Sequence, residues 1–148
     1  MNKRHHNLLL ADDDIDDCIF FKDALDELAL SVTLTTVNDG VQLMNYLSVL
    51  SGQLPDMLFL DLNMPLKSGF DCLLEIKQFD KYKKLPVIIF STSLSMDVVE
   101  LLYQKGAYYY IRKPGEYGKL KKIILEAITH ISHNKFVQPS RDEFILQP

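Results

Sequence analysis

The feature that most constrains the fold is a short apolar run that ends on a single carboxylate. Residues 57–60 read Met-Leu-Phe-Leu, Asp61 follows them, and Pro55 and Pro65 bound the stretch. An uninterrupted apolar run of this length between prolines indicates a strand buried on both faces. A charge at the end of such a strand is costly unless it lies in a cleft with partners. We therefore expect Asp61 to lie in a cleft at the carboxyl end of this strand.

Similar strands alternate with helical patterns along the whole chain. The expected strands cover residues 8–11, 32–37, 57–60, 86–90 and 107–111, and the expected helices cover 15–30, 41–50, 70–79, 95–105 and 117–131. Asp14 or Asp16 is expected to cap the first helix, and Gly106 to end the fourth in a left-handed conformation. Five strands alternating with five helices predict an α/β fold, a doubly wound five-stranded parallel sheet with helices on both faces.

Length and composition predict one globular domain. The chain has 148 residues, 47% of them hydrophobic and 24% charged, and a net charge of −4. We assign residues 1–148 to a single domain, with a core over about 7–131 and a tail over 132–148. Because the chain has no dense basic patch, DNA binding is not expected.

The N-terminus and the cysteines set the expected compartment. A few basic residues precede only four apolar ones, which is too short for a signal peptide or a membrane span. Cys18 and Cys72 lie in amphipathic patterns without metal-ligand spacing, so we interpret them as reduced core residues. A cytoplasmic protein without membrane contact is expected.

Chemically useful side chains follow four of the five expected strands, and these are Asp12, Asp13, Asp61, Ser91 and Lys113. The carboxyl ends of parallel strands form one edge of the sheet, where ligands bind. Converging carboxylates repel one another unless a cation is present, and hard oxygen ligands suit Mg²⁺. An aspartate flanked by a metal ion and an ammonium is suited to forming an acyl phosphate.

Each of these residues also has an ordinary structural explanation. Residues 12–14 can cap a helix, Lys113 can be a surface charge, and Ser91 can be a turn residue. Chance explains one such placement easily, but not the same coincidence at four strand ends. We therefore favour a phosphoryl site.

The motifs resemble those of the response-regulator receiver domains of two-component signalling, over about residues 7–131. The resemblance is carried by Leu-Leu-Leu-Ala-Asp-Asp at 8–13, Phe-Leu-Asp-Leu-Asn-Met-Pro at 59–65 with Gly69 after it, Ile-Ile-Phe-Ser-Thr at 88–92 and Tyr-Ile-Arg-Lys-Pro at 110–114. It implies the flavodoxin-like, CheY-like strand order 2-1-3-4-5.

The resemblance also implies a role for each site residue. Asp61 would be the phosphoacceptor, and the Mg²⁺ ligands would be Asp13 directly, Asp12 through water, Asp61, and the main-chain carbonyl of Asn63. Ser91 and Lys113 would bind the phosphoryl group, and Ser91 and Tyr110 would form the switch, with Tyr110 turning inward as Ser91 moves toward the phosphoryl group. The Lys113–Pro114 bond would be cis.

The implied function is a phosphorylation switch rather than an ordinary enzyme. A sensor histidine kinase or a phosphotransfer protein would supply the phosphoryl group, and the domain would catalyse its own phosphotransfer and slow autodephosphorylation. Only 17 residues follow Ile131, so we expect a stand-alone receiver that signals to a downstream protein by direct contact. The alternative is a receiver that carries phosphate in a relay. The tail can pack back, contact a second copy or remain disordered.

The expected fourth helix is unusually apolar. Its large apolar side chains, Met96, Val98, Leu101, Leu102 and Tyr103, outnumber what one core stripe requires. They indicate either further core packing or a partner surface, which includes a homodimer.

Two alternatives come from other classes. An aspartyl-phosphate phosphohydrolase of the haloacid-dehalogenase type also starts from an aspartate at a strand end, but it needs a second aspartate where this chain has Asn63. A flavin-binding domain would need a hydroxyl- and glycine-rich loop after the first strand, where this chain has three acids. If phosphorylation fails, the remaining interpretation is a phosphorylation-independent binding module.

Overall fold

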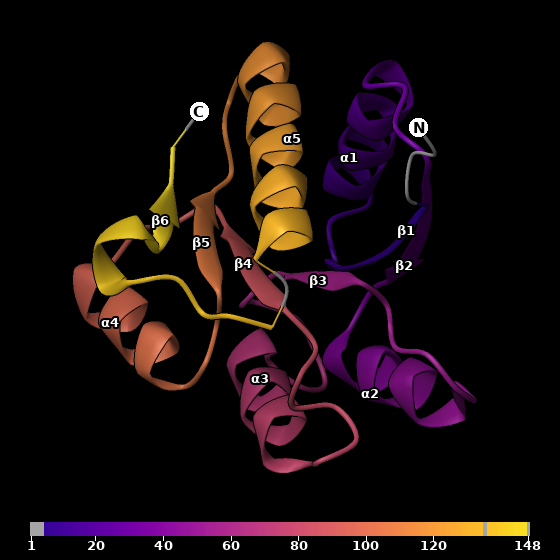
Figure 1. Ribbon diagram of the computed structural model, residues 1–148, viewed down its shortest axis with the longest axis vertical. Coiled ribbons are helices and arrows are strands. Elements are labelled where there is room, and N and C mark those ends of the chain that lie inside the picture. The colour runs from indigo at the N-terminus through magenta and orange to yellow at the C-terminus, as the bar shows by residue number, and fades with distance from the viewer. Residues whose placement is uncertain (1–4, 135, 148) are drawn as a thin grey trace.

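A six-stranded parallel sheet forms the centre of the molecule, in the order β2-β1-β3-β4-β5-β6 (Figure 1). The computed structural model describes residues 5–134 and 136–147. The strands are β1 (His6–Ala11), β2 (Val32–Val37), β3 (Met57–Leu60), β4 (Val87–Ser91), β5 (Tyr109–Arg112) and β6 (Ile145–Leu146). The α/β class and the order of the first five strands are as predicted.

Helices cover both faces of the sheet. They are α1 (Ile15–Glu27), α2 (Gly40–Val49), α3 (Gly69–Gln78), α4 (Met96–Gln104) and α5 (Tyr117–His133). The helices α1 and α5 pack on one face, and α2, α3 and α4 pack on the other. Within the described chain, none of these helices combines the length and apolar character needed to cross a membrane.

Alternating side chains of the central strands feed both cores. In β1, Leu8 and Leu10 face α1 and α5, whereas Leu9 and Ala11 face the opposite layer. All four are buried, as are all four residues of β3. This double burial is the physical reason that neither strand shows polar alternation in its sequence.

Backbone conformation explains where the helices begin and end. The side chain of Asp14 caps α1 by accepting a hydrogen bond from the backbone N–H of Asp17 at 3.2 Å, and Gly106 ends α4 with φ at 102°. Both features confirm the sequence predictions. However, α1 ends at Glu27 and not at residue 30, because Ala29 takes a left-handed conformation with φ at 53°.

The sixth strand corrects the predicted sheet of five. The tail packs back on the domain, where a short 3₁₀ helix, η1 (Arg141–Glu143), leads into β6. There Ile145 pairs with Tyr110 and Leu146 with Ile111 in parallel register. The strand arises because β5 offers an open sheet edge, and Phe144 and Leu146 become buried when the tail lies along it.

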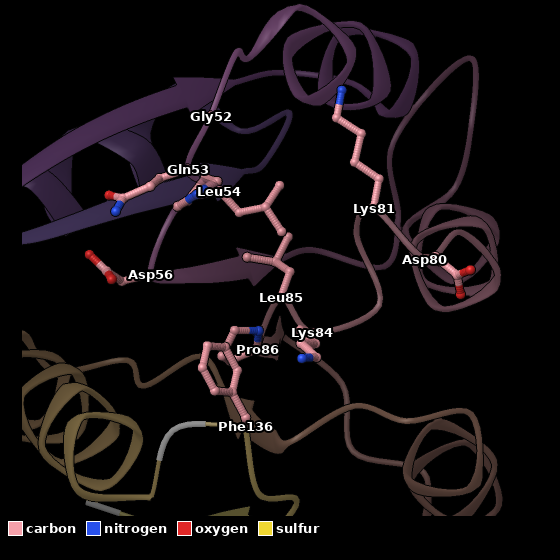
Figure 2. A pocket seen from close by; sticks show the side chains of 11 residues that line it. Gly52, Gln53, Leu54, Asp56, Asp80, Lys81, Lys84, Leu85, Pro86 and Phe136 are labelled. Carbon is pink, nitrogen blue, oxygen red and sulfur yellow. The ribbon is translucent and has the colours of Figure 1, made fainter.

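A cavity of about 360 Å³ lies at the amino ends of β3 and β4 (Figure 2). Its walls include Leu54, Pro55, Leu85, Pro86 and Phe136. None of the predicted site residues lines it, since Tyr110 lies within β5 and the others lie at or beyond the carboxyl ends of their strands. This cavity is therefore separate from the site described next.

Candidate functional site

Three carboxylates meet at the carboxyl edge of the sheet, as predicted. Ala11 and Leu60 are paired in register at the ends of β1 and β3, so the residues that follow them become neighbours. One carboxylate oxygen each from Asp12, Asp13 and Asp61 lies within 4.8 Å of the others. Asp12 and Asp61 are buried and Asp13 is exposed, which gives the cluster one side open to solvent.

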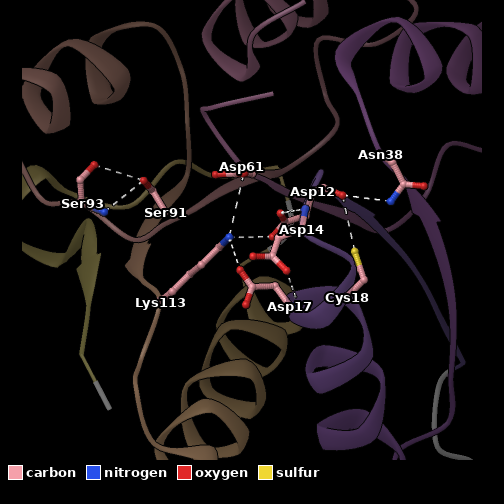
Figure 3. A network of polar contacts seen from close by, with 9 residues as sticks. All are labelled: Asp12, Asp14, Asp17, Cys18, Asn38, Asp61, Ser91, Ser93 and Lys113. Atoms are coloured by element: carbon pink, nitrogen blue, oxygen red, sulfur yellow. Dashed lines mark hydrogen bonds and ion pairs between the residues drawn. The ribbon is translucent and has the colours of Figure 1, made fainter. Parts of the chain in front are cut away.

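Lys113 brings a cation to this cluster from the end of β5 (Figure 3). Its Nζ lies 2.7 Å from Asp12 Oδ2, 2.8 Å from Asp17 Oδ2 and 4.0 Å from Asp61 Oδ2. The side chain is only 10% exposed. Sequence reasoning missed Asp17, although its place in the first turn of α1, close to Asp12 and Asp13, was a signal that it faces the same edge.

Burial and crowding of charge perturb the acids. Removal from water is the largest cause and raises the pKa of Asp61 to about 7, with the charge of Asp12 adding to the effect and Lys113 opposing it. Burial likewise raises the pKa of Asp12. Burial acts to lower the pKa of Lys113, but the carboxylates around it raise this pKa above its ordinary value. The site thus holds more negative charge than one ammonium neutralises.

Ser91 and Tyr110 lie on the neighbouring strands. Ser91 is fully buried at the end of β4, and its Oγ lies 3.3 Å from Ser93 Oγ and 3.4 Å from the backbone N of Ser93. Tyr110 is also fully buried, and its hydroxyl donates to the carbonyl of Ser93 at 2.5 Å. The ring of Tyr110 therefore occupies the inward position in this structure.

Two glycines allow backbone segments to meet beside the site. A Cβ on Gly69 would lie 2.0 Å from the carbonyl oxygen of Asp61, and a Cβ on Gly40 would lie 2.0 Å from that of Lys67. Because both obstacles are backbone atoms, no side-chain rotation relieves them. Only glycine fits at these positions of close approach.

Comparison with known proteins decides the family. Residues 8–125 match the response regulator receiver domain. The chain belongs to this family. Receiver domains are phosphorylation-activated signalling domains and act as phosphoacceptors, and two-component signalling is their setting.

Relatives include regulators of different lengths. The receiver domain is 38% identical over 101 residues to the DNA-binding transcriptional regulator NtrC of Proteus hauseri, which covers 68% of this chain and 20% of NtrC. The chain thus spans about one fifth of the relatives that it matches first. It is 29% identical over 121 residues to response regulator Rcp1 of Synechocystis sp., covering 79% of this chain and 82% of Rcp1.

Solved structures have the same fold. The phosphorylated cyanobacterial phytochrome response regulator RcpA is 30% identical, with a TM-score of 0.77 over 93% of this chain and 100% of that one. The Mn²⁺-bound form of Rcp1 is 27% identical, with a TM-score of 0.75 over 91% and 99% of the two chains. The second structure is of a metal-bound relative.

The acidic cluster of the receiver domain has the composition of a divalent-cation site. Its donors are three carboxylates, hard oxygen ligands of the kind that Mg²⁺ and Mn²⁺ prefer. Two of the three are buried, and burial, the largest cause, together with the charge of Asp12 raises the pKa of Asp61. Asp12, Asp13 and Asp61 therefore fit a divalent cation.

Other side chains hold the Asp12 backbone in place and were not identified from sequence. The amide of Asn38 donates to the carbonyl of Asp12 at 3.1 Å, and the Cys18 thiol contacts the same carbonyl at 3.5 Å. Cys18 and Cys72 are both free and buried, which confirms their assignment as reduced core residues.

The predicted cis bond at the end of β5 is wrong. The Lys113–Pro114 bond is trans. Trans is the preferred isomer before proline by about 0.5–1 kcal/mol, so cis requires surroundings that select it. Here Lys113 reaches Asp12, Asp17 and Asp61 with the trans bond.

Proposed function

We propose that Asp61 of this receiver domain accepts a phosphoryl group from the phosphohistidine of a sensor histidine kinase or phosphotransfer protein. The observation that carries this proposal is the buried Asp61 carboxylate, with Lys113 Nζ 4.0 Å away and Asp12 and Asp13 beside it. This arrangement places a nucleophile, the Asp61 carboxylate, next to the Lys113 ammonium and next to carboxylates that can bind a cation, and positive charge of this kind stabilises a phosphoryl group.

The chain's own residues have distinct parts in the transfer. An oxygen of Asp61 attacks phosphorus in line, the bond from phosphorus to the histidine nitrogen breaks, and an acyl phosphate forms. Lys113 neutralises one phosphoryl oxygen, and the Ser91 hydroxyl donates to another. Hydrolysis of the acyl phosphate returns the carboxylate, and we propose that this autodephosphorylation is slow.

Mg²⁺ is the proposed cofactor. Asp12, Asp13 and Asp61 would hold it with the main-chain carbonyl of Asn63, and it would supply positive charge to the phosphoryl oxygens. Asp13 would be a direct ligand and Asp12 would act mainly through water. Mg²⁺ suits a site of few carboxylates because it keeps several waters and also binds phosphate oxygens.

The affinity for Mg²⁺ should depend on pH. Because the pKa of Asp61 is about 7 without metal, a proton competes with the cation below that pH. We expect the affinity to fall by about tenfold per pH unit below pH 7 and to level off above it. Calorimetric titration between pH 5.5 and 8.5 measures this, and Asp61→Asn should bind more weakly and lose most of the slope. A constant wild-type affinity over this range would contradict it.

The proposed function itself is tested by covalent modification. We expect the protein, incubated with Mg²⁺ and acetyl phosphate, to gain the mass of one phosphoryl group. Asp61→Asn should gain none, because an amide cannot form the acyl phosphate, and omission of Mg²⁺ should prevent the reaction. Intact-mass spectrometry reads the result. If the wild type remains unmodified and does not respond to beryllofluoride, the binding-module interpretation replaces the switch.

We propose that the domain passes its signal on by direct contact with a downstream protein and does not itself bind DNA. The proposed compartment is the cytoplasm. Met96, Val98 and Leu101 of α4 are 55%, 39% and 39% exposed, so they suit a downstream partner or a second copy. By contrast, Leu102 is buried in the core and Tyr103 packs against the tail residue Phe144. The apolar surplus of α4 is therefore divided between core, tail and surface.

A further inference from the structure

The C-terminal segment, residues 136–147, is bound to the domain along β5. It follows the outer side of β5 and lies next to α4, in yellow in Figure 1. The backbone N–H of Tyr110 donates to the carbonyl of Phe144 at 2.9 Å, and the Phe144 side chain is fully buried. The segment therefore lies directly beside the inward-facing Tyr110.

Specific side-chain contacts also fasten the segment to α4. The Tyr103 hydroxyl donates to the carbonyl of Pro139 at 2.8 Å, and the Gln138 amide donates to the carbonyls of Tyr103 and Ala107, each at 2.8 Å. Arg141 Nε lies 2.6 Å from Glu100 Oε2. The segment therefore bridges α4 and β5.

Phe144 connects this bridge to the phosphoryl site. Its ring packs edge-on against Tyr103 and Tyr110, with ring centroids 5.1 and 6.4 Å apart. Tyr110 in turn donates its hydroxyl to the Ser93 carbonyl, and Ser93 contacts Ser91 Oγ through its backbone N–H and its hydroxyl. A continuous series of contacts thus runs from Phe144 through Tyr110 and Ser93 to Ser91.

We infer that Phe144 and the C-terminal segment are positioning elements of the phosphorylation site. Phe144 packs against the Tyr110 ring from the side of the C-terminal segment. It thereby holds that ring inward and keeps the Tyr110 hydroxyl on the Ser93 carbonyl. This fixes the segment that follows β4, and with it the Ser91 hydroxyl at the end of that strand, before a phosphoryl group arrives. The inference rests on the proposed function, since it assigns a role within the same switch.

Thermodynamic linkage gives the expected direction. If the docked segment stabilises the inward Tyr110 that the phosphorylated state requires, it raises the affinity of the site for a phosphoryl group. A phosphoryl group must then stabilise docking of the segment by the same factor. Couplings of this kind typically change an affinity by roughly 5- to 150-fold.

The test uses the full chain with Mg²⁺ and beryllofluoride, which stands in for the phosphoryl group on Asp61. We expect Phe144→Ala to weaken beryllofluoride binding at least about fivefold, Phe144→Leu to restore most of the affinity, and Val137→Ala, at a 61% exposed position, to leave it unchanged. In the wild type, beryllofluoride should slow hydrogen exchange at the Tyr110 amide, which reports directly on its bond to Phe144.

The outcomes are separable. Unchanged or tighter beryllofluoride binding by a folded Phe144→Ala variant overturns the inference, even if that variant is less stable. A wild type that does not respond to beryllofluoride overturns the proposed function instead. Should Phe144→Ala not fold, Arg141→Gln, which removes the contact with Glu100, must weaken binding in the same direction, and no change there overturns the inference.

Discussion

Replacing Lys113 with methionine should destabilise the protein by about 3–5 kcal/mol at pH 8, because it leaves buried carboxylates without their cation. Asp12 is fully buried, and its Oδ2 lies 2.7 Å from Lys113 Nζ. Asp61 is 6% exposed and relies on the same ammonium. Methionine keeps most of the packing volume, so the lost charge causes most of the expected effect.

The loss should shrink as the pH falls. Burial already raises the pKa values of Asp12 and Asp61, that of Asp61 to about 7. Without Lys113 both pKa values rise further, since the nearest positive charge has gone. Below pH 6 the Asp61 carboxyl group of the variant is therefore protonated, and a neutral acid tolerates burial better than an ion. The variant should thus lose stability relative to the wild type as the pH rises through neutrality.

Urea unfolding of the metal-free protein at pH 5.5 and pH 8 measures this difference. Lys22→Met is the matched control, because the Lys22 side chain is 64% exposed and pairs with Asp26 at i,i+4 at 3.5 Å. Its expected cost is about 0.3–0.5 kcal/mol at both pH values. If Lys113→Met costs the same at pH 5.5 and pH 8, the cost does not come from the titrating carboxylates, and the contact of the ammonium with the Phe90 ring, whose centroid is 5.4 Å from Nζ, is the remaining source.

The sheet and the acidic site were predictable because they rest on local signals. Buried strands such as β3 have unalternating apolar sequences, and parallel strands bring their carboxyl ends to one edge whatever the loops between them do. Asp12, Asp13, Asp61 and Lys113 meet for that reason alone. Residue types at the strand ends were therefore enough to predict an acidic, cation-binding site.

What sequence did not reveal depends on contacts distant in the chain. Asp17 becomes a site residue only because Lys113, 96 positions later, reaches it. The strand β6 has two residues, too few to show any periodicity, and exists because β5 presents an open edge. The end of α1 was also hidden, because its left-handed residue is Ala29 and not the glycine that usually marks such a position.

Replacing Gly69 with alanine should nearly abolish phosphorylation. The added Cβ would lie 2.0 Å from the Asp61 carbonyl oxygen and 2.8 Å from the Cα of Leu62, so either α3 or the end of β3 must move. Gly69 also donates its backbone N–H to the Leu62 carbonyl at 2.9 Å, which ties α3 to the segment directly after the phosphoacceptor. A shift of about 1 Å at a reacting group can cost roughly 100-fold in rate.

Acetyl phosphate kinetics followed by intact mass measure that rate, and urea unfolding gives the accompanying loss of stability, expected at about 1–3 kcal/mol. Gly118→Ala is the matched control, because a Cβ there meets no described atom within 4 Å and the position lies in the first turn of α5. That control should keep the wild-type rate and gain no more than the roughly 0.5–1 kcal/mol that alanine contributes over glycine in a helix interior. A Gly69→Ala variant with a wild-type rate would show that the Asp61 carboxylate keeps its place when the backbone beneath it moves, and that the close approach of α3 serves packing alone.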